Sequence, residues 1–159
     1  MIKSLSKSAE KVQSVLNQYG LELTVIEFSE STRTSQEAAD AIGCELGQIA
    51  KSLIFKGKET QKPVCVIASG VNRVNEKKIR EYVGEKIEKA DAAFVLEHTG
   101  FAIGGVPPIG HITEVKTILD EDLFKYLEIW AAAGTPHAVF KLTPDALLRI
   151  TRGEVVLIK

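Results

Sequence analysis

Two features of the sequence combine residue types and spacings that could take part in chemistry. Lys51 stands between the apolar residues Ile49-Ala50 and Leu53-Ile54, where a short helical turn is expected to pass into a strand. Segment 101–111, FAIGGVPPIGH, holds three glycines and two prolines among its last eight residues. Glycine permits positive φ and close approach, whereas proline fixes φ and removes a backbone donor. The segment therefore predicts a rigid loop rather than a helix or a central strand.

Each feature allows two interpretations from the residues alone. Lys51 is either a surface lysine at the start of a strand or a fixed positive charge for a phosphate or a developing oxyanion. The loop is either a structural double turn or a backbone cradle for a ligand. In the second case Gly104 and Gly105 bring N–H groups to a ligand carbonyl, ester or ribose, and Pro107 and Pro108 hold that shape.

The common catalytic motifs are absent from the chain. It contains no G-x-S-x-G, H-E-x-x-H or P-loop sequence, and its glycine loop is not G-x-G-x-x-G. The three histidines lie far apart and lack metal-ligand spacing: His98, His111 and His137. We expect neither a metal nor a cofactor, and His111 is of interest mainly because it follows the loop directly.

The elements that must position these residues follow from periodicity and from helix-capping and helix-stop residues. Helices are expected at residues 7–19, 34–42, 75–83, 91–98 and from 143, with short helical turns at 45–50 and from Asp120. Strands are expected at residues 21–28, 52–57, 63–70, 111–119, 127–134, 137–142 and 154–159. Mixed hairpin and helical connections predict a single α+β domain, residues 1–159, with a curved mixed sheet of six to eight strands and about five helices.

Composition places the chain among ordinary globular proteins. It has 159 residues, 45% of them hydrophobic and 26% charged, and no apolar run long enough for a membrane span. The first twenty residues lack a signal-peptide apolar region, and neither Cys44 nor Cys65 belongs to a C-x-x-C pair. We therefore expect a cytoplasmic protein, not bound to membranes, whose two cysteines are reduced core residues.

The charge is unevenly distributed. Between Lys51 and Lys89 there are ten Lys or Arg and five Glu, although the net charge of the whole chain is −1. Such a region could dock a polyanion or could be a solvated helix with interleaved charges.

Four stretches together resemble the YbaK/EbsC family of aminoacyl-tRNA deacylases, related to the editing domain inserted in bacterial prolyl-tRNA synthetases. They are SQEAADAIGCELGQIAKSLIF, VIASGVNRVNEKKI, TGFAIGGVPPIGH and WAAAGTPHAVFKLTPDALLRIT, in the family's order and over nearly the whole chain. The resemblance implies an α+β domain with a curved, barrel-like mixed sheet surrounded by helices. It also implies hydrolysis of amino acids wrongly esterified to tRNA.

Carried onto this sequence, the resemblance makes Lys51 and Gly104 the catalytic positions. Lys51 would bind the phosphate of the terminal adenosine or polarise the ester, and the loop backbone would position the ester and the attacking water. The substrate-binding residues it implies are Gly105, Val106, Pro107, Pro108, Ser69, Gly70, His111, Gly134 and Thr135, with His111 in a supporting role. The implied partners are the acceptor end of an aminoacyl-tRNA and, as a candidate, a prolyl-tRNA synthetase.

Three functions remain open at this point. The first is a freestanding trans-editing deacylase, with Cys-tRNA(Pro) or Ala-tRNA(Pro) as its leading substrates by family analogy. The second is a non-catalytic tRNA- or synthetase-binding module of the same fold. The third is a hydrolase of another small ester or nucleotide that uses the same loop.

Overall fold

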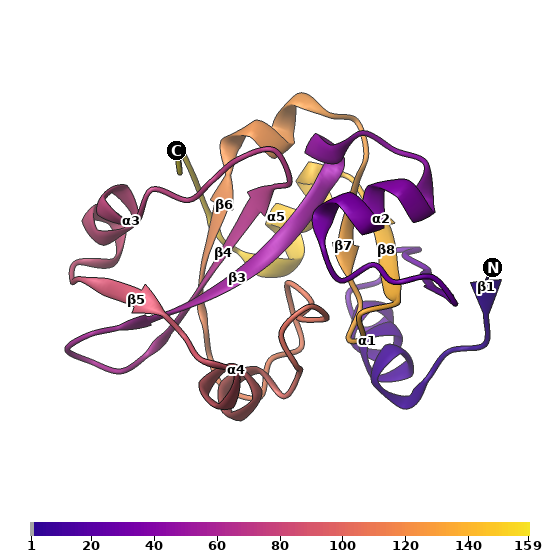
Figure 1. Cartoon of the computed structure of the whole chain (residues 1–159), viewed down its shortest axis with the longest axis horizontal. Helices are drawn as coiled ribbons and strands as arrows, with labels where there is room; N and C mark the ends of the chain where they lie inside the picture. Colours follow the sequence, from indigo (N-terminus) through magenta and orange to yellow (C-terminus); the bar gives the residue numbers. More distant parts are fainter. Residues whose placement is uncertain (1) are drawn as a thin grey trace.

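The computed structural model describes residues 2–159, which form one mixed β-sheet with helices packed around it (Figure 1). The strands are β1 (Ile2–Lys3), β2 (Val25–Phe28), β3 (Ile49–Gly57), β4 (Pro63–Ser69), β5 (Ile87–Lys89), β6 (Lys116–Asp120), β7 (Ile129–Ala132), β8 (Ala138–Leu142) and β9 (Glu154–Val156). The helices are α1 (Lys7–Asn17), α2 (Ser35–Ile42), α3 (Glu76–Val83), α4 (Ala92–Thr99) and α5 (Pro144–Thr151), with 3-10 turns η1 (Leu46–Gln48) and η2 (Glu121–Lys125). The predicted α+β class with a mixed sheet is confirmed.

The sheet runs in the order β1-β2-β8-β7-β3-β4-β6-β9, and β5 pairs with the far end of β3. Strands β3 and β4 form the long antiparallel pair at its centre, whereas β3/β7, β4/β6 and β6/β9 are parallel. β3 pairs with β7 only at Ile49 and Ala50 and with β5 only from Phe55. The sheet is therefore open on this side of β3 between those two contacts.

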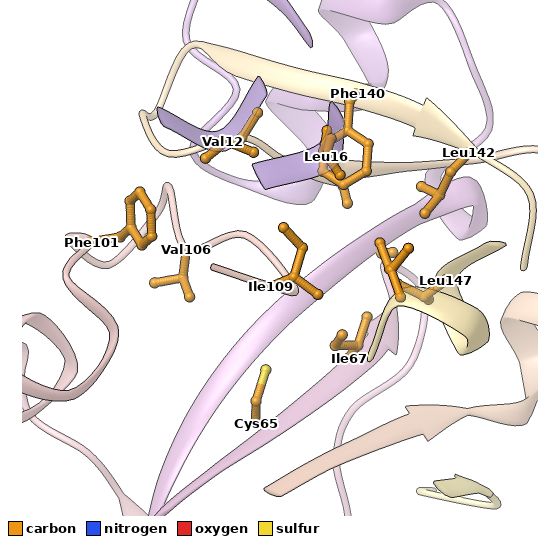
Figure 2. Close-up of a cluster of buried hydrophobic side chains, with 14 of the residues drawn as sticks. Val12, Leu16, Cys65, Ile67, Phe101, Val106, Ile109, Phe140, Leu142 and Leu147 are labelled. Carbon is orange, nitrogen blue, oxygen red and sulfur yellow. The ribbon is translucent and has the colours of Figure 1, made fainter. Parts of the chain in front are cut away.

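The apolar core explains why the glycine–proline loop has a fixed place in the fold. The largest cluster joins one face of α1 to β7, β8 and α5, and the loop contributes Phe101, Val106 and Ile109 to it. Figure 2 shows Ile109 pointing in among Leu16, Ile67 and Leu147. Burial of each such side chain is worth about 1.5–3 kcal/mol. The loop is consequently anchored in the core at its start, its middle and near its end.

Local sequence signals place most helix ends as expected. The Thr34 side chain accepts a hydrogen bond from the Glu37 N–H at the start of α2, and Gly43 ends that helix at φ 83°. Gly84 and Gly100 end α3 and α4 in the same left-handed conformation. A glycine at this position avoids the penalty that a Cβ would bring.

Several strand predictions were too long, and the strand count was too low. The segment 21–28 is a strand only from Val25, and 127–134 only over Ile129–Ala132. The segment 111–119 is a strand only from Lys116, because Ile112 and Thr113 donate their N–H groups to carbonyls of Thr99 and His98 at the end of α4. The final strand ends at Val156 instead of continuing to the terminus. Residues 2–159 contain nine strands rather than six to eight, since β1 and β5 are very short pairings that no periodicity marks.

The two cysteines are free thiols, as expected. Cys65 is fully buried in β4, and desolvation raises the pKa of its thiol to about 12. Cys44 is only partly buried, so the prediction that both lie in the core holds for Cys65 alone. Among residues 2–159, no helix combines the length and the apolar character that crossing a membrane would need.

Candidate functional site

A cleft occupies the opening of the sheet beside β3. It has two adjoining lobes of about 490 Å³ and 820 Å³, and Lys51, Gly70 and Gly104 line both. The first lobe extends toward α2 and β7 over largely apolar side chains, including Leu46, Ile49, Trp130, Ala131 and Val139. The second extends toward the 70–76 turn and β5 and contains Arg73 and Lys89. Lys51 and the loop thus meet at one site, although they lie about fifty residues apart.

Lys51 is a half-buried cation within this cleft. Burial lowers the pKa of its ammonium, the nearby Arg73 lowers it further, and Asp120 partly offsets both effects. A cation held beside another cation in a partly desolvated position favours an anion or a strong acceptor as ligand. Of the ten basic residues between Lys51 and Lys89, three line the cleft: Lys51, Arg73 and Lys89.

The two adjacent glycines of the loop, Gly104 and Gly105, have different roles. Gly104 has φ 97° and lines both lobes, and within residues 2–159 its N–H has no hydrogen-bond partner. Gly105 is buried behind it, where its N–H donates to the Ala102 carbonyl and its own carbonyl accepts from the Gly134 N–H at 2.8 Å. Gly104 therefore offers a backbone donor to the cleft, whereas Gly105 fixes the loop to the β7–β8 connection.

The remaining loop residues form its support. Val106 lines both lobes, but Pro107 and Pro108 are buried and do not line the cleft described for residues 2–159. The His111 Nε2 bonds the Pro107 carbonyl at 2.7 Å, which closes the loop on itself. With a carbonyl acceptor, this nitrogen must carry the proton. The structure thus places His111 as a brace of the loop.

Gly134 and Thr135 contact the loop at Gly105. A Cβ on Gly105 would come within 2.8 Å of the Thr135 backbone, and the Thr135 hydroxyl donates to the buried Glu27 carboxylate at 3.4 Å. The resemblance implied that these two residues line the pocket, but neither is among the cleft residues of the described chain. Through their contacts with Gly105, these two residues hold the loop in place.

Of the neighbouring residues Ser69 and Gly70, only Gly70 lines the cleft of the described chain. Gly70 lines both lobes, and a Cβ there would meet the Leu46 carbonyl oxygen at 2.3 Å. Ser69 is fully buried; its hydroxyl donates to the Gly47 carbonyl at 2.7 Å and its N–H donates to Asp120 at 2.9 Å. Ser69 therefore shapes the turn that carries Gly70 and does not reach the cleft.

A buried acidic network beneath this turn is a feature that sequence reasoning missed. The Asn72 side chain donates to both Asp120 and Asp122 at 2.8 Å, and Asp122 forms ion pairs with Lys125 and Lys159 at 2.8 Å. Hydrogen bonds from Lys125, Lys159 and Asn72 hold the pKa of Asp122 well below its usual range. The only sequence signal was the run of three acidic residues in ILDED after an apolar strand, which by itself suggested a helix start.

Removing the Asp120 carboxylate should damage both stability and the site. We expect Asp120→Ala to lower the free energy of unfolding by about 2–4 kcal/mol, because it leaves the buried Ser69 N–H without an acceptor. Since the same turn carries Gly70 and Arg73, KM for a cleft ligand should rise as well. Urea titrations check the stability, with Glu121→Ala at the exposed neighbouring position as control. A variant as stable as the wild type would show that the network contributes nothing.

The pH dependence of stability should carry a contribution from His111. Burial lowers the pKa of its imidazole, so the unfolded chain binds the proton more readily. Stability is then complete above the unfolded pKa of about 6.5 and decreases as pH falls toward the folded value. In His111→Gln, which keeps an N–H donor, the loss between pH 7.5 and 5.5 should be smaller. Unfolding free energies at both pH values test this, with His98→Gln as control; an unchanged loss would contradict it.

Arg33 was also missed, and it borders the first lobe. Its side chain lies over Gly104, since a Cβ there would come within 2.6 Å of the Arg33 Cγ. The segment between β2 and α2 has no regular periodicity, so nothing in the sequence distinguished this arginine from a surface residue.

No group of three or more His, Cys, Asp or Glu side chains within residues 2–159 could hold a metal ion.

Comparison with known proteins connects this cleft to a family. Residues 29–150 match the family described as the aminoacyl-tRNA editing domain. The match includes Lys51, the 101–111 loop and the Asp120 network, and it covers more than half of the chain.

Similar proteins of comparable length occur in Bacillus and Enterococcus. The "Uncharacterized protein YwhH" of Bacillus subtilis is 34% identical over 93% of this chain and 94% of its own. A protein of Enterococcus faecalis named "Putative Cys-tRNA(Pro)/Cys-tRNA(Cys) deacylase EbsC" is 28% identical over 97% of this chain and 95% of its own. The proline–tRNA ligase of Thermosipho melanesiensis is 34% identical over 65% of this chain, a stretch that makes up 18% of the ligase.

Solved structures agree with these matches. One described as a "putative trans-editing enzyme for prolyl tRNA synthetase" is 48% identical, has a TM-score of 0.92, and covers 98% of this chain and 99% of its own. A second, the hypothetical protein APE2540, is 27% identical with a TM-score of 0.86 over 93% of this chain and 98% of its own. Together with the match over residues 29–150, these likenesses show that the chain belongs to the aminoacyl-tRNA editing domain family, in its YbaK/EbsC branch.

Proposed function

We propose that this protein is a freestanding trans-editing deacylase that hydrolyses the ester between an amino acid and the terminal ribose of a mischarged tRNA. The observation that carries the proposal is the meeting of the half-buried Lys51 with the unpaired Gly104 N–H in a two-lobed cleft. The family to which the chain belongs supports the same chemistry.

The two lobes suit the two parts of such a substrate. The second lobe contains Arg73 and Lys89 together with Lys51, and these cations would bind phosphates of the acceptor end without reading base sequence. The first lobe is lined largely by apolar side chains, with Arg33 at its border, and would enclose the amino acid. Gly104, at the junction, would then lie beside the ester.

The lining of the cleft favours hydrolysis by a positioned water rather than by a covalent intermediate. Within the described residues, the two lobes contain no histidine, cysteine or aspartate, and Glu76 is their only carboxylate. In our proposal water adds to the acyl carbon, the ester C–O bond breaks, and the departing ribose oxygen takes up a proton. The neighbouring ribose hydroxyl orients the water and relays this proton, while Lys51 and the Gly104 N–H stabilise the oxygen that gains charge.

The experiment is a panel of mischarged tRNAs. Release of labelled amino acid from Cys-, Ala-, Ser- and Thr-tRNA(Pro) is measured with and without the protein, with Pro-tRNA(Pro) as the correctly charged control. Cys-tRNA(Pro) is proposed as substrate by analogy with the Enterococcus relative, and Ala-tRNA(Pro) by the family resemblance of the sequence. Hydrolysis of none of these esters would refute the proposal.

A second candidate is a non-catalytic module that binds tRNA or a prolyl-tRNA synthetase in the cytoplasm. The cations of the second lobe favour tRNA binding, and the partial match to proline–tRNA ligases favours a synthetase as partner. Salt-dependent tRNA binding without ester cleavage would support this alternative over the deacylase.

A further inference from the structure

The backbone of β3 is unpaired where it borders the cleft. At its two ends, the Gly70 N–H donates to the Ile49 carbonyl and the Gly57 N–H donates to the Lys62 carbonyl. Because hydrogen-bonded pairs alternate along an antiparallel ladder, the odd-numbered residues from 49 to 57 direct their backbone groups toward β4. The even-numbered residues direct theirs to the opposite edge, as the Ala90 N–H bonded to the Ile54 carbonyl shows.

Ser52 is the even-numbered residue inside the gap between β7 and β5. The ladder to β7 ends at Ala50, and the ladder to β5 begins at Phe55. Farther along β7, the next inward donor, the Gly134 N–H, bonds the Gly105 carbonyl of the loop instead of β3. Within residues 2–159 the N–H and C=O of Ser52 therefore face the cleft side by side without a strand partner.

The hydroxyl group of Ser52 is not available to a ligand in the cleft. Its hydroxyl oxygen is buried, and it lies beside the Cys65 thiol on the core side of the sheet. Ser52 nevertheless lines both lobes, and because its hydroxyl oxygen is buried, its backbone is the polar part that is left to interact with a ligand. A backbone N–H and C=O on one edge form the pair that an antiparallel neighbour residue would complete.

An aminoacyl group is chemically one residue of a strand, with an amine donor and a carbonyl acceptor on either side of Cα. We propose, resting on the deacylase function above, that Ser52 docks the aminoacyl group as a one-residue antiparallel strand. Its N–H donates to the ester carbonyl oxygen, and its C=O accepts from the α-ammonium. Directly opposite residues project side chains to the same face, where Ala50, Val106 and Ala131 line the first lobe.

The first test compares alanyl-tRNA with propionyl-tRNA, which lacks only the amine. Each rate is divided by the uncatalysed rate of the same ester, because the ammonium itself activates the ester. We expect the acceleration to be about 10-fold or more lower for propionyl-tRNA, the size of one lost hydrogen bond to a charged group. Equal acceleration of the two esters would overturn the proposal.

The second test removes the donor from the protein. Ser52→Pro deletes the N–H at an edge position, where a strand tolerates proline, and should lower kcat/KM about 30-fold or more. Ser52→Ala loses the hydroxyl but keeps the backbone N–H, so its kcat/KM should exceed that of Ser52→Pro by about 10-fold or more. A folded Ser52→Pro protein with wild-type activity would refute the assignment.

A binding measurement separates this proposal from the function on which it rests. The probe is 3′-alanylamino-3′-deoxyadenosine, whose amide link resists hydrolysis, added to ¹⁵N-labelled wild-type protein. A shifted Ser52 amide resonance, absent with adenosine alone, supports the docking even if Ser52→Pro does not fold or no charged tRNA is hydrolysed. Binding of the probe without a change at the Ser52 amide, or no binding of it, overturns the docking whatever the hydrolysis panel shows.

Discussion

Lys51→Ala should lower kcat/KM for a mischarged tRNA about 100-fold or more while leaving the fold intact. The expected loss is large because Lys51 borders both lobes of the cleft, as does Gly104 with its unpaired N–H. The melting temperature should change by only about 3 °C, since removing a partly desolvated ammonium also removes its desolvation penalty. Deacylation kinetics and thermal unfolding measure the two effects.

Two further variants make the Lys51 result specific. Lys58→Ala removes a cation from the same basic span at an exposed hairpin position and should leave kcat/KM nearly unchanged. Lys51→Arg keeps the charge in a larger, planar group and should recover only part of the activity. If Lys51→Ala deacylates at the wild-type rate, Lys51 has no part in the chemistry.

The second large effect is expected at Gly105. A Cβ there would lie 2.8 Å from the N, Cα and C atoms of Thr135, and a backbone so placed cannot yield without moving the loop. We expect Gly105→Ala to destabilise the protein by about 2–3 kcal/mol and to lower kcat, because Gly104 would be displaced with it. Urea unfolding and single-turnover deacylation test the two parts.

Gly43→Ala is the matched control for this steric argument. Gly43 has φ 83°, so alanine there should cost about 1 kcal/mol in backbone strain, but nothing lies within 4 Å of its Cβ position. Gly105 is not among the described glycines with positive φ, so alanine at this position would not bring the same backbone strain. If Gly43→Ala proves the more damaging substitution, close packing against Thr135 is not what fixes the loop.

Local signals were sufficient for much of the fold. The N-caps at Thr34 and Thr143 and the stop at Gly43 were predictable, because each depends on residues within one helical turn. The apolar run of β4 was equally informative, since a strand buried on both faces has a nearly continuous hydrophobic sequence. The β1 and β5 pairings were not predictable, because two or three residues carry no periodicity.

From the sequence alone, candidate site residues could be singled out only where a residue type was unusual for its surroundings. Gly104 and Lys51 stood out because a flexible glycine in a proline-rich loop and a lysine in an apolar run are both unusual. The Asp120–Asn72 bond joins residues 48 apart in sequence, and the Gly105–Gly134 bond joins two loops. Such contacts depend on tertiary pairing, so the supporting roles of Ser69 and Gly134 emerged only with the structure, whereas a supporting role for His111 was already expected from the resemblance.

The most direct test of the account is the initial rate of amino-acid release from Ala-tRNA(Pro) and Cys-tRNA(Pro), compared for wild-type protein, Lys51→Ala and no protein. The account predicts rapid release by the wild type from at least one of these esters. It also predicts that Lys51→Ala releases the amino acid about 100-fold more slowly and that Pro-tRNA(Pro) stays intact. Wild-type release no faster than the uncatalysed rate for both esters would contradict the account at its centre.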